Sequence, residues 1–497
     1  MRRFAGLVLV PALLAGCGST VPLAAQNQAN AGLAAPGASQ SAAPAGTSQA
    51  PGTSLGGASS SGATGTAAAA GQSGPSAQGA GSGTGPAVSP QGVRSSAPLT
   101  IGVVLTKTSN AESFGVSANN TVTEQKVDDA VIAGINEHGG LAGHKLVVVY
   151  ASTDTGSSNW DTDFAAACAT FTQDHHVVAV LGYVFNYVQS FERCLASKGI
   201  PHLSTGFNVP DRPELAKFPL QFDLVVPTID RRGLLKLENG VADGVLTSKS
   251  KLGIITDTCP GTPTSLNQVF LPKAKQLGLN VAKVVSISCP NGNADSSSAV
   301  GALQNAVLQF ASTGVDRVIF HASSEGPALL LFSLSAESQH YRPEYVVSSL
   351  ANLDALHSYV PAAQINNIHG YGWMPTQDVP PSAYPKPNAL QARCLGLLRS
   401  KKITPVAGTD FAYAYEFCES VFVYERALLA TGGDSSGTKV ASAVKALGSS
   451  FASLTNEGGS LFSAERPDAP RFARHLVYAS ACSCFRYTGP TRANPIS

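Results

Sequence analysis

The chain has 497 residues, 33 Lys and Arg against 32 Asp and Glu, a formal net charge of +1 and only 13% charged residues. Charged residues are few and the two signs are balanced, so the chain lacks the broad basic surface that attracts nucleic acid. This excludes a nucleic-acid-binding function. Beyond the N-terminal leader there is no run of about 18 apolar residues, which excludes a polytopic membrane protein.

The first residues are typical of an export signal. Arg2 and Arg3 supply positive charge, and the apolar stretch 7–14 is too short to span a bilayer, so residues 1–16 are predicted to be a cleaved signal peptide. The ending Leu-Ala-Gly-Cys resembles the lipobox of bacterial lipoproteins. This resemblance implies that Cys17 is acylated, with palmitate among its fatty acids, and anchors an extracytoplasmic protein to the bacterial cell membrane. An ordinary signal peptide with an incidental cysteine is the alternative.

Residues 17–97 are predicted to be the lipidated cysteine and a disordered tether. After Cys17 the segment is almost all Ala, Gly, Ser, Thr, Pro and Gln, with Arg94 as its one charge. It has too little apolar area to offset chain entropy. As a flexible coil it would span roughly 50 Å. The nucleophile pattern Gly-x-Ser-x-Gly at 52–56 has no strand before it and no helix after it, so we treat it as chance.

The folded part opens with a strand, a helix and a strand. The apolar run 99–105 is rich in β-branched residues and predicts a buried strand. Apolar residues recur every four positions from 127 to 135, which indicates a helix, and the glycines at 139–140 end it. Residues 145–150 predict a second strand. The unit is right-handed and parallel by the general rule for such crossovers.

The same alternation continues along the chain. Further strands are predicted at 177–181 and 200–203, with helices at 160–173 and 191–198. From residue 221 we expect a second series, with strands at 221–226, 252–256, 281–287, 317–321 and 345–348 and helices clearest at 266–277, 299–311 and 328–336. The last third predicts a strand at 368–373, a Pro-rich loop up to 387, a long helix at 411–430 and a closing hairpin at 475–479 and 485–487.

This pattern predicts an α/β protein with two Rossmann-like lobes. Its strands are too apolar to face water, so both faces of each parallel sheet should be covered by helices. About 400 residues exceed one ordinary core. We expect the first lobe at 98–226 and the second at 227–350.

Eight cysteines remain besides Cys17, an even number in an oxidising compartment. Eight permit 105 pairings. We favour pairing in sequence order, since each of the first three bridges closes a loop of about 25–30 residues and adds roughly 3 kcal/mol. The fourth ring is so small that it strains the geometry. A zinc site is the alternative, without a supporting C-x-x-C. The favoured pairs are Cys168–Cys194, Cys259–Cys289, Cys394–Cys418 and Cys482–Cys484.

Several motifs resemble those of type I periplasmic binding proteins, specifically the branched-chain amino acid and amide receptors of ABC importers. The resemblance covers essentially all of the chain from residue 99 to its end. Its motifs are Ile-Gly-Val-Val at 101–104, Ile-Asn-Glu-His-Gly-Gly-Leu-Ala-Gly-His-Lys-Leu at 135–146, Val-Leu-Gly at 180–182, Gly-Ile-Pro-His-Leu-Ser at 199–204 and Asp-Phe-Ala-Tyr-Ala-Tyr at 410–415. The resemblance implies a Venus-flytrap fold whose lobes are joined by a multi-crossover hinge, with 351–497 returning to both lobes. It also supports Cys168–Cys194, since many relatives carry a disulfide there.

A ligand is expected beyond the carboxyl ends of the strands, where open parallel sheets bind their ligands. Some residues at these strand ends have alternative roles. Phe185 and Phe207 could equally be core residues, and Asn186 and Asn208 could merely shape turns. Glu325 could be a charge that stabilises the start of a helix. The predicted ligand-binding residues are Tyr183, Phe185, Asn186, Ser204, Thr205, Phe207 and Asn208 in the first lobe and Asp257, Thr258, Ser324, Glu325 and Ser349 in the second.

The departures from the resembled family bear on the ligand. Phe185 and Asn186 stand where relatives carry a serine pair for an amino acid's carboxylate, and Cys259 with Pro260 replaces a tyrosine. An aromatic mouth of Tyr183, Phe185, Tyr187 and Phe207 favours a solute larger or more aromatic than a simple amino acid.

The resemblance implies a monomeric receptor that hands a small molecule to ABC permease subunits, with no cofactor, no metal and no nucleic-acid partner. The alternative is a ligand sensor or cell-envelope scaffold of the same fold without a transporter. An enzyme is not expected. His202, Ser204 and Asp257 could be imagined as a catalytic set, but no motif places them together.

Overall fold

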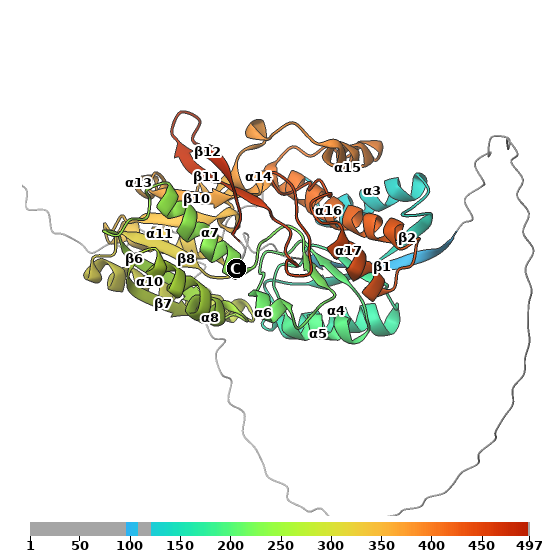
Figure 1. Cartoon of the computed structure of the whole chain (residues 1–497), viewed down its shortest axis with the longest axis horizontal. Helices are drawn as coiled ribbons and strands as arrows, with labels where there is room; N and C mark the ends of the chain where they lie inside the picture. The colour runs from blue at the N-terminus through green and yellow to red at the C-terminus, as the bar shows by residue number, and fades with distance from the viewer. Residues whose placement is uncertain (1–95, 108–120, 496–497) are drawn as a thin grey trace, which may run out of the picture. The chain divides into compact units, whose positions relative to one another are not determined.

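The computed structural model describes residues 96–107 and 121–495 (Figure 1). The predicted signal peptide, Cys17 and nearly all of the predicted tether lie outside the described residues. Both sheets described below lie within one compact unit of the chain. None of the helices that the structure describes combines the length and apolarity needed to cross a membrane.

The first sheet is parallel throughout, and both of its faces are covered. Ile101 and Val103 of β1 pack with helix α3, whereas Val104, on the opposite face, packs with Phe164 of α4. The strand order is β2-β1-β3-β4-β5, with bounds β1 (Ser96–Thr106), β2 (His144–Thr153), β3 (Ala179–Gly182), β4 (His202–Ser204) and β5 (Gln221–Asp223). Its helical segments are α3 (Glu124–Glu137), α4 (Trp160–Ala169), η1 (Thr170–Asp174), α5 (Gln189–Ser197) and α6 (Arg212–Leu215).

One element is placed differently from the expectation. Residues 221–226 were predicted to begin the second series of strands, but β5 pairs in parallel with β4, Phe222 opposite Leu203. The strand is short and ends at Asp223, and the apolar residues that follow leave the first sheet. The apolar run therefore contains an edge strand of one sheet and the start of a crossover to the other.

The second sheet is mainly parallel, with an antiparallel hairpin at one edge. The predicted closing hairpin is confirmed, with Leu476 opposite Tyr487. The strand order is β12-β11-β10-β9-β8-β6-β7, with bounds β6 (Lys251–Asp257), β7 (Asn280–Ile287), β8 (Arg317–His321), β9 (Glu344–Ser348), β10 (Ile368–Gly372), β11 (Phe472–Ala479) and β12 (Cys484–Ala493). The helical segments between them are α7 (Ile229–Ala242), α8 (Thr262–Ser265), η2 (Leu266–Phe270), α9 (Leu271–Gln276), α10 (Asn293–Thr313), α11 (Glu325–Ser338), η3 (Ser349–Ala351), α12 (Leu353–Leu356), α13 (Ala362–Ile365), α14 (Pro375–Asp378) and η4 (Pro381–Ala383).

The chain passes between the two sheets three times. After β5 it enters the second sheet, after β10 it returns to pack α16 beside β3 and α15 beside α3, and it then comes back as β11. The helices of the return are α15 (Ala389–Ser400), α16 (Gly408–Ala430) and α17 (Gly437–Ala446) (Figure 1).

The three passages are tied to one another, and we call the tying residues the crossover cluster: Leu224, Val225, Trp373, Asn456 and Glu457. The Trp373 indole Nε1 donates to Val225 O at 2.8 Å, and Asn456 Nδ2 donates to Leu224 O at 2.9 Å. Glu457 N donates to Trp373 O at 2.8 Å. The predicted two-sheet fold with multiple crossovers is thus confirmed.

All eight cysteines predicted to pair do so in sequence order, so the zinc alternative is wrong. Cys168–Cys194 joins α4 to α5, Cys394–Cys418 joins α15 to α16, Cys259–Cys289 joins the loops after β6 and β7, and Cys482–Cys484 lies in the turn between β11 and β12.

Candidate functional site

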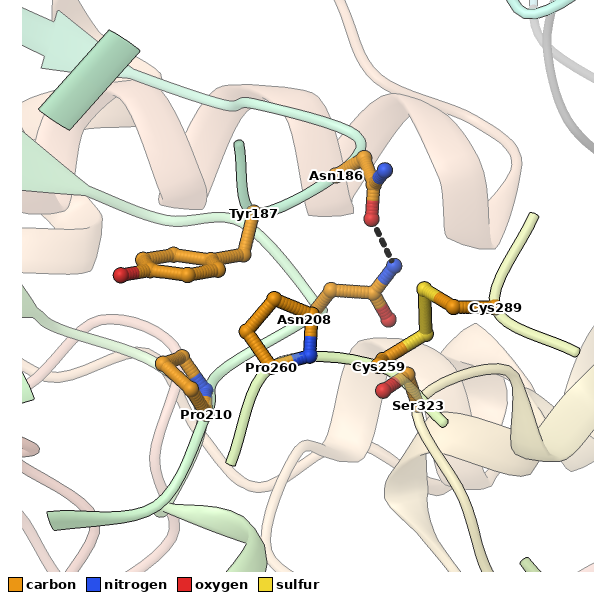
Figure 2. Close-up of a pocket in the computed structure, with 8 residues that line it drawn as sticks. All are labelled: Asn186, Tyr187, Asn208, Pro210, Cys259, Pro260, Cys289 and Ser323. Atoms are coloured by element: carbon orange, nitrogen blue, oxygen red, sulfur yellow. Dashed lines mark hydrogen bonds between the residues drawn. A yellow bond between two sulfur atoms is a disulfide. The ribbon is translucent and has the colours of Figure 1, made fainter. Parts of the chain in front are cut away.

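A small pocket lies where the carboxyl ends of the two sheets face each other, the place that the fold favours for a ligand. Loops after β3 and β4 form one wall, and loops after β6, β7 and β8 form the other. The lining residues are Asn186, Tyr187, Asn208 and Pro210 on the first wall and Cys259, Pro260, Cys289 and Ser323 on the second (Figure 2).

The pocket is nearly closed. Its cavity volume is about 10 Å³, which is about the room that one water molecule needs. On the first wall Asn208 Nδ2 donates to Asn186 Oδ1 at 2.6 Å, so the two amides partly satisfy each other (Figure 2). Pockets for small molecules usually have a few hundred Å³. A solute of amino-acid size therefore requires the walls to move apart.

Tyr187 completes the first wall with its ring, while its hydroxyl is held by Glu214. Tyr187 Oη donates to Glu214 Oε1 at 3.0 Å, and Gln189 Nε2 donates to the same oxygen at 2.5 Å. Burial opposes ionisation of this carboxyl, but hydrogen bonds from Lys217, Gln189 and Tyr187 outweigh it and lower the pKa of Glu214. The ring of Tyr187 is therefore fixed from the side away from the pocket.

Asp257 and Thr258, two predicted ligand residues, support the second wall instead of lining it. Asp257 Oδ1 accepts a hydrogen bond from Cys259 N at 3.0 Å, and its Oδ2 accepts one from Ser323 N at 2.5 Å. Thr258 Oγ1 accepts one from Cys289 N at 2.9 Å. Together with the Cys259–Cys289 disulfide, these bonds position the backbone of the residues that line this wall.

The prediction that Phe185 lines the mouth is wrong. Its side chain is 2% exposed and packs in the core with Trp160 and Phe164, at ring-centroid distances of 5.1 Å and 5.6 Å. Tyr183 and Phe207 form an edge-to-face pair at 5.3 Å and are half-buried, but neither lines the pocket. The core alternative weighed for Phe185 is the correct one.

Ser204 and Thr205 shape the turn after β4. Both are buried; Ser204 Oγ accepts from Gly206 N at 3.0 Å, and Thr205 N donates to Gly182 O at 3.0 Å. A Cβ at Gly206 would lie 2.3 Å from Val184 O, so the two loops touch through backbone. This close approach keeps both hydroxyls behind the first wall.

Glu325 is a buried ion-pair partner, which contradicts its prediction as a ligand residue. It is the first residue of α11, pairs with Lys236, and lies 3.6 Å from Arg232 Nη1. Its Oε2 accepts from Ser348 N and Ser348 Oγ, both at 2.8 Å. Burial lowers the pKa of both cations, and Glu325 counteracts it by favouring their charged forms. We call Glu325, Lys236 and Arg232 the ionic cluster.

Ser349 and Ser324 also lie outside the pocket lining. Ser349 Oγ donates to Asp378 Oδ2 at 2.9 Å and accepts from Trp373 N at 2.8 Å, so this residue supports the crossover cluster. Ser324 is half-buried and directly precedes α11. Of the predicted ligand residues, the structure thus brings Asn186 and Asn208 into the pocket.

Of the predicted aromatic mouth, Tyr187 lines the pocket. Most of the lining residues that were not predicted lie in the predicted strand-end loops. Cys259, Pro260 and Ser323 belong to the turns after β6 and β8, and strand-end position was the signal for them. Cys289 follows the edge strand β7, and its predicted bridge to Cys259 could have placed it there. Pro210, two residues beyond Asn208, carried no signal of its own.

The residues around the two sheets also contact each other outside the pocket lining. Asn291 O accepts from Trp160 N at 2.9 Å, and Asn291 Nδ2 donates to Asp161 Oδ2 at 3.2 Å. Gly261 has φ +83°, and a Cβ there would lie 2.5 Å from Asp211 N. The two walls therefore meet without room for a side chain at Gly261.

Among residues 96–107 and 121–495, no three His, Cys, Asp or Glu side chains are grouped so that they could hold a metal ion. A scan against protein-family models and a search of curated proteins each returned no match.

Solved structures, in contrast, match over almost their whole length. A leucine-binding protein from Thermotoga maritima is 14% identical, with a TM-score of 0.57, and the match covers 80% of this chain and 99% of that one. A solute-binding protein of an ABC transporter from Rhodopseudomonas palustris, in complex with p-hydroxybenzoic acid, is 15% identical, with a TM-score of 0.59 and coverages of 80% and 97%. An ABC-transporter substrate-binding protein from Desulfitobacterium hafniense, in complex with Leu, is 16% identical, with a TM-score of 0.53 and coverages of 79% and 100%.

Proposed function

We propose that this chain, which has the fold of the type I periplasmic binding proteins, is an extracytoplasmic solute-binding protein that delivers a small molecule to an ABC importer. The observation that carries the proposal is the pocket between the carboxyl ends of the two sheets, in a fold shared over nearly the full length of solute-binding proteins. Such a protein needs no catalytic residue. It needs only a conformation with higher affinity for the solute and a partner that senses it.

The lining residues favour a solute with a ring and hydrogen-bonding groups. Tyr187 offers a fixed aromatic face, and Asn186 and Asn208 offer amides that can exchange their mutual bond for bonds to a ligand. Pro260 and the Cys259–Cys289 disulfide add apolar surface opposite. We therefore propose a solute that is larger or more aromatic than a simple amino acid.

A thermal-shift screen of the full chain tests the proposal, with leucine, p-hydroxybenzoate, other aromatic acids, amides and sugars as probes. We expect at least one compound to raise the melting temperature, because a ligand that binds only the folded state stabilises it. Calorimetry on Asn208→Ala should then show affinity reduced at least tenfold for that compound. The matched control is Asn267→Ala, an exposed asparagine on η2, which should bind like the native chain.

Two results would contradict the proposal. One is a folded native chain that no compound stabilises. The other is a compound that binds Asn208→Ala and the native chain equally, since that compound would occupy a different place.

The membrane anchor is part of the same proposal and rests on the sequence ending at Cys17. Cys17→Ser should release the protein from bacterial membranes into the soluble extracytoplasmic fraction, because the acyl chains would be lost. A control change at Ser19→Ala should leave it membrane-bound. Membrane retention of Cys17→Ser would reject lipid anchoring without touching the solute-binding proposal.

A second candidate function is a sensor or cell-envelope scaffold that keeps the fold without a transporter. The closed pocket of about 10 Å³ favours it, since a scaffold needs no solute-sized space. Crosslinking on intact cells separates the two. Recovery of a permease subunit supports transport, and recovery of envelope proteins without one supports the scaffold.

A further inference from the structure

The turn between β11 and β12 carries a disulfide unlike the other three. Cys482 and Cys484 are two residues apart, whereas the other bridges join residues separated by 24 to 30 positions. Ser483 between them has φ +51°, a left-handed conformation that a serine rarely adopts. The hairpin lies at the edge of the second sheet (Figure 1).

Stabilisation does not explain this bridge. A disulfide stabilises a protein mainly by reducing the conformational entropy of the unfolded chain, and this reduction is larger when the bridge closes a longer loop. A bridge between residues two positions apart therefore contributes least. The hairpin is already held by the ladder between β11 and β12, which runs from Phe472 opposite Ala493 to Ala479 opposite Cys484. We therefore consider the reactivity of its two sulfurs.

The two sulfurs have different surroundings. Cys482 is half-buried next to the exposed Ser483, whereas Cys484 is 7% exposed. Arg486 Nε lies 3.3 Å from Cys482 Sγ and can donate a hydrogen bond to it. A guanidinium beside a sulfur stabilises the thiolate, and a sulfur that is stable as thiolate is a good leaving group. By contrast, Cys394 and Cys418 are fully buried.

We infer that Cys482–Cys484 is a thiol–disulfide exchange site, which accepts two electrons from an accessible dithiol and converts that dithiol into a disulfide. The partner is a molecule with two neighbouring thiols on a flexible segment. This activity is separate from solute binding, because the hairpin turn contributes no residue to the pocket.

The exchange proceeds in two displacements. A thiolate of the dithiol attacks Cys482 Sγ; the new sulfur–sulfur bond forms as the Cys482–Cys484 bond breaks, and the electron pair goes to Cys484 Sγ, which takes up a proton. The second thiolate of the dithiol then attacks its own partner sulfur, and Cys482 leaves as a thiolate beside Arg486. The dithiol has lost two electrons and two protons, one to Cys484 and one to solvent or Cys482.

The first test measures each disulfide of the full chain in mixtures of reduced and oxidised dithiothreitol at pH 7, with acid quenching, alkylation and mass spectrometry. We expect Cys482–Cys484 to be half-reduced at a reduced-to-oxidised ratio at least tenfold lower than Cys394–Cys418. Reduction of both at the same ratio, or of Cys482–Cys484 last, would overturn the inference.

The second test uses a synthetic peptide with two cysteines as the dithiol. The native chain should form about one equivalent of oxidised peptide, and Cys482→Ser/Cys484→Ser, checked by circular dichroism, should form none. Arg486→Gln should slow the reaction at least threefold at pH 7. Arg471→Gln, an exposed arginine just before β11, should not. Equal oxidation by the double variant would assign the chemistry to another disulfide, and an unchanged rate for Arg486→Gln would remove the role of the guanidinium.

Discussion

The two walls of the pocket are built in different ways. The second wall is braced from behind: Asp257 fixes the backbone of Cys259 and Ser323, a disulfide joins two of its loops, and the ionic cluster holds the start of α11. The first wall presents two amides bonded to each other and a tyrosine ring fixed through its hydroxyl. The comparison indicates that a ligand would rearrange side chains on the first wall, while the second serves as a rigid surface.

The largest expected effect is on stability and comes from the ionic cluster behind the second wall. Glu325→Gln leaves Lys236 and Arg232 buried without a countercharge at this position, so we expect a loss of about 3–5 kcal/mol in the free energy of unfolding. Denaturant unfolding measures it. The control is Glu238→Gln on the same helix α7 as Lys236; Glu238 is part of a partly exposed pair with Lys273 and should cost about 0–1 kcal/mol. Equal, small losses in both variants would mean that the second wall does not depend on the ionic cluster.

The next effect concerns the contact between the walls. Gly261→Ala places a Cβ 2.5 Å from Asp211 N, so the walls cannot meet as they do here. Because a solute already requires the walls to stand further apart, the variant disfavours the arrangement that excludes the solute, and we expect the affinity for any ligand found by screening to rise severalfold. The strain of an alanine at positive φ must be separated from this effect. Gly278→Ala does so, because Gly278 has φ +69° with no atom within 4 Å of the added Cβ.

Small-angle scattering of the free proteins would add an independent readout. Gly261→Ala should have a larger radius of gyration than Gly278→Ala, since the clash separates the two walls and strain alone does not. Identical scattering and identical affinity would show that the contact at Gly261 does not control how far apart the two walls stand.

The strands and the four disulfides could be predicted because their signals are local: apolar runs of strand length, glycines at helix ends and cysteines that close short loops. The side chains that face the pocket could not. Phe185 and Asn186 are neighbours at one strand end, yet one packs in the core and the other lines the pocket, and only the path of the loop decides which. Glu325 pairs with Lys236, 89 positions away, so a residue that looked available for a ligand was already satisfied. The ends of the parallel strands indicate where a site lies. Which side chains line it depends on their contacts with residues of distant elements.

The smallest effect tests whether the meeting of the walls depends on pH. Asp211 caps α6 and faces Gly261, and burial raises the pKa of its carboxyl from 3.8 to about 6, with further upward contributions from Asp230 and Glu214 against the lowering effect of Lys217 and a backbone hydrogen bond. Between about pH 4 and about 6 the folded state thus binds more protons than the unfolded state, so the native chain loses stability as pH rises through this window.

Asp211→Asn keeps the helix cap and removes the titrating group. The difference in melting temperature, variant minus native chain, should therefore rise from pH 4 to 6 and then level off. Asp434→Asn is the matched control. A hydrogen bond from Lys439 holds the pKa of Asp434 below its usual value of 3.8 in the folded state, so the native chain gains stability from this carboxylate as pH rises to about 5. The difference curve of Asp434→Asn should therefore fall slightly up to about pH 5 and then level off, opposite in sign to that of Asp211→Asn. A curve for Asp211→Asn that does not rise would mean that the carboxyl stays hydrated where the two walls meet, and that the contact at Gly261 is looser than the backbone distance indicates.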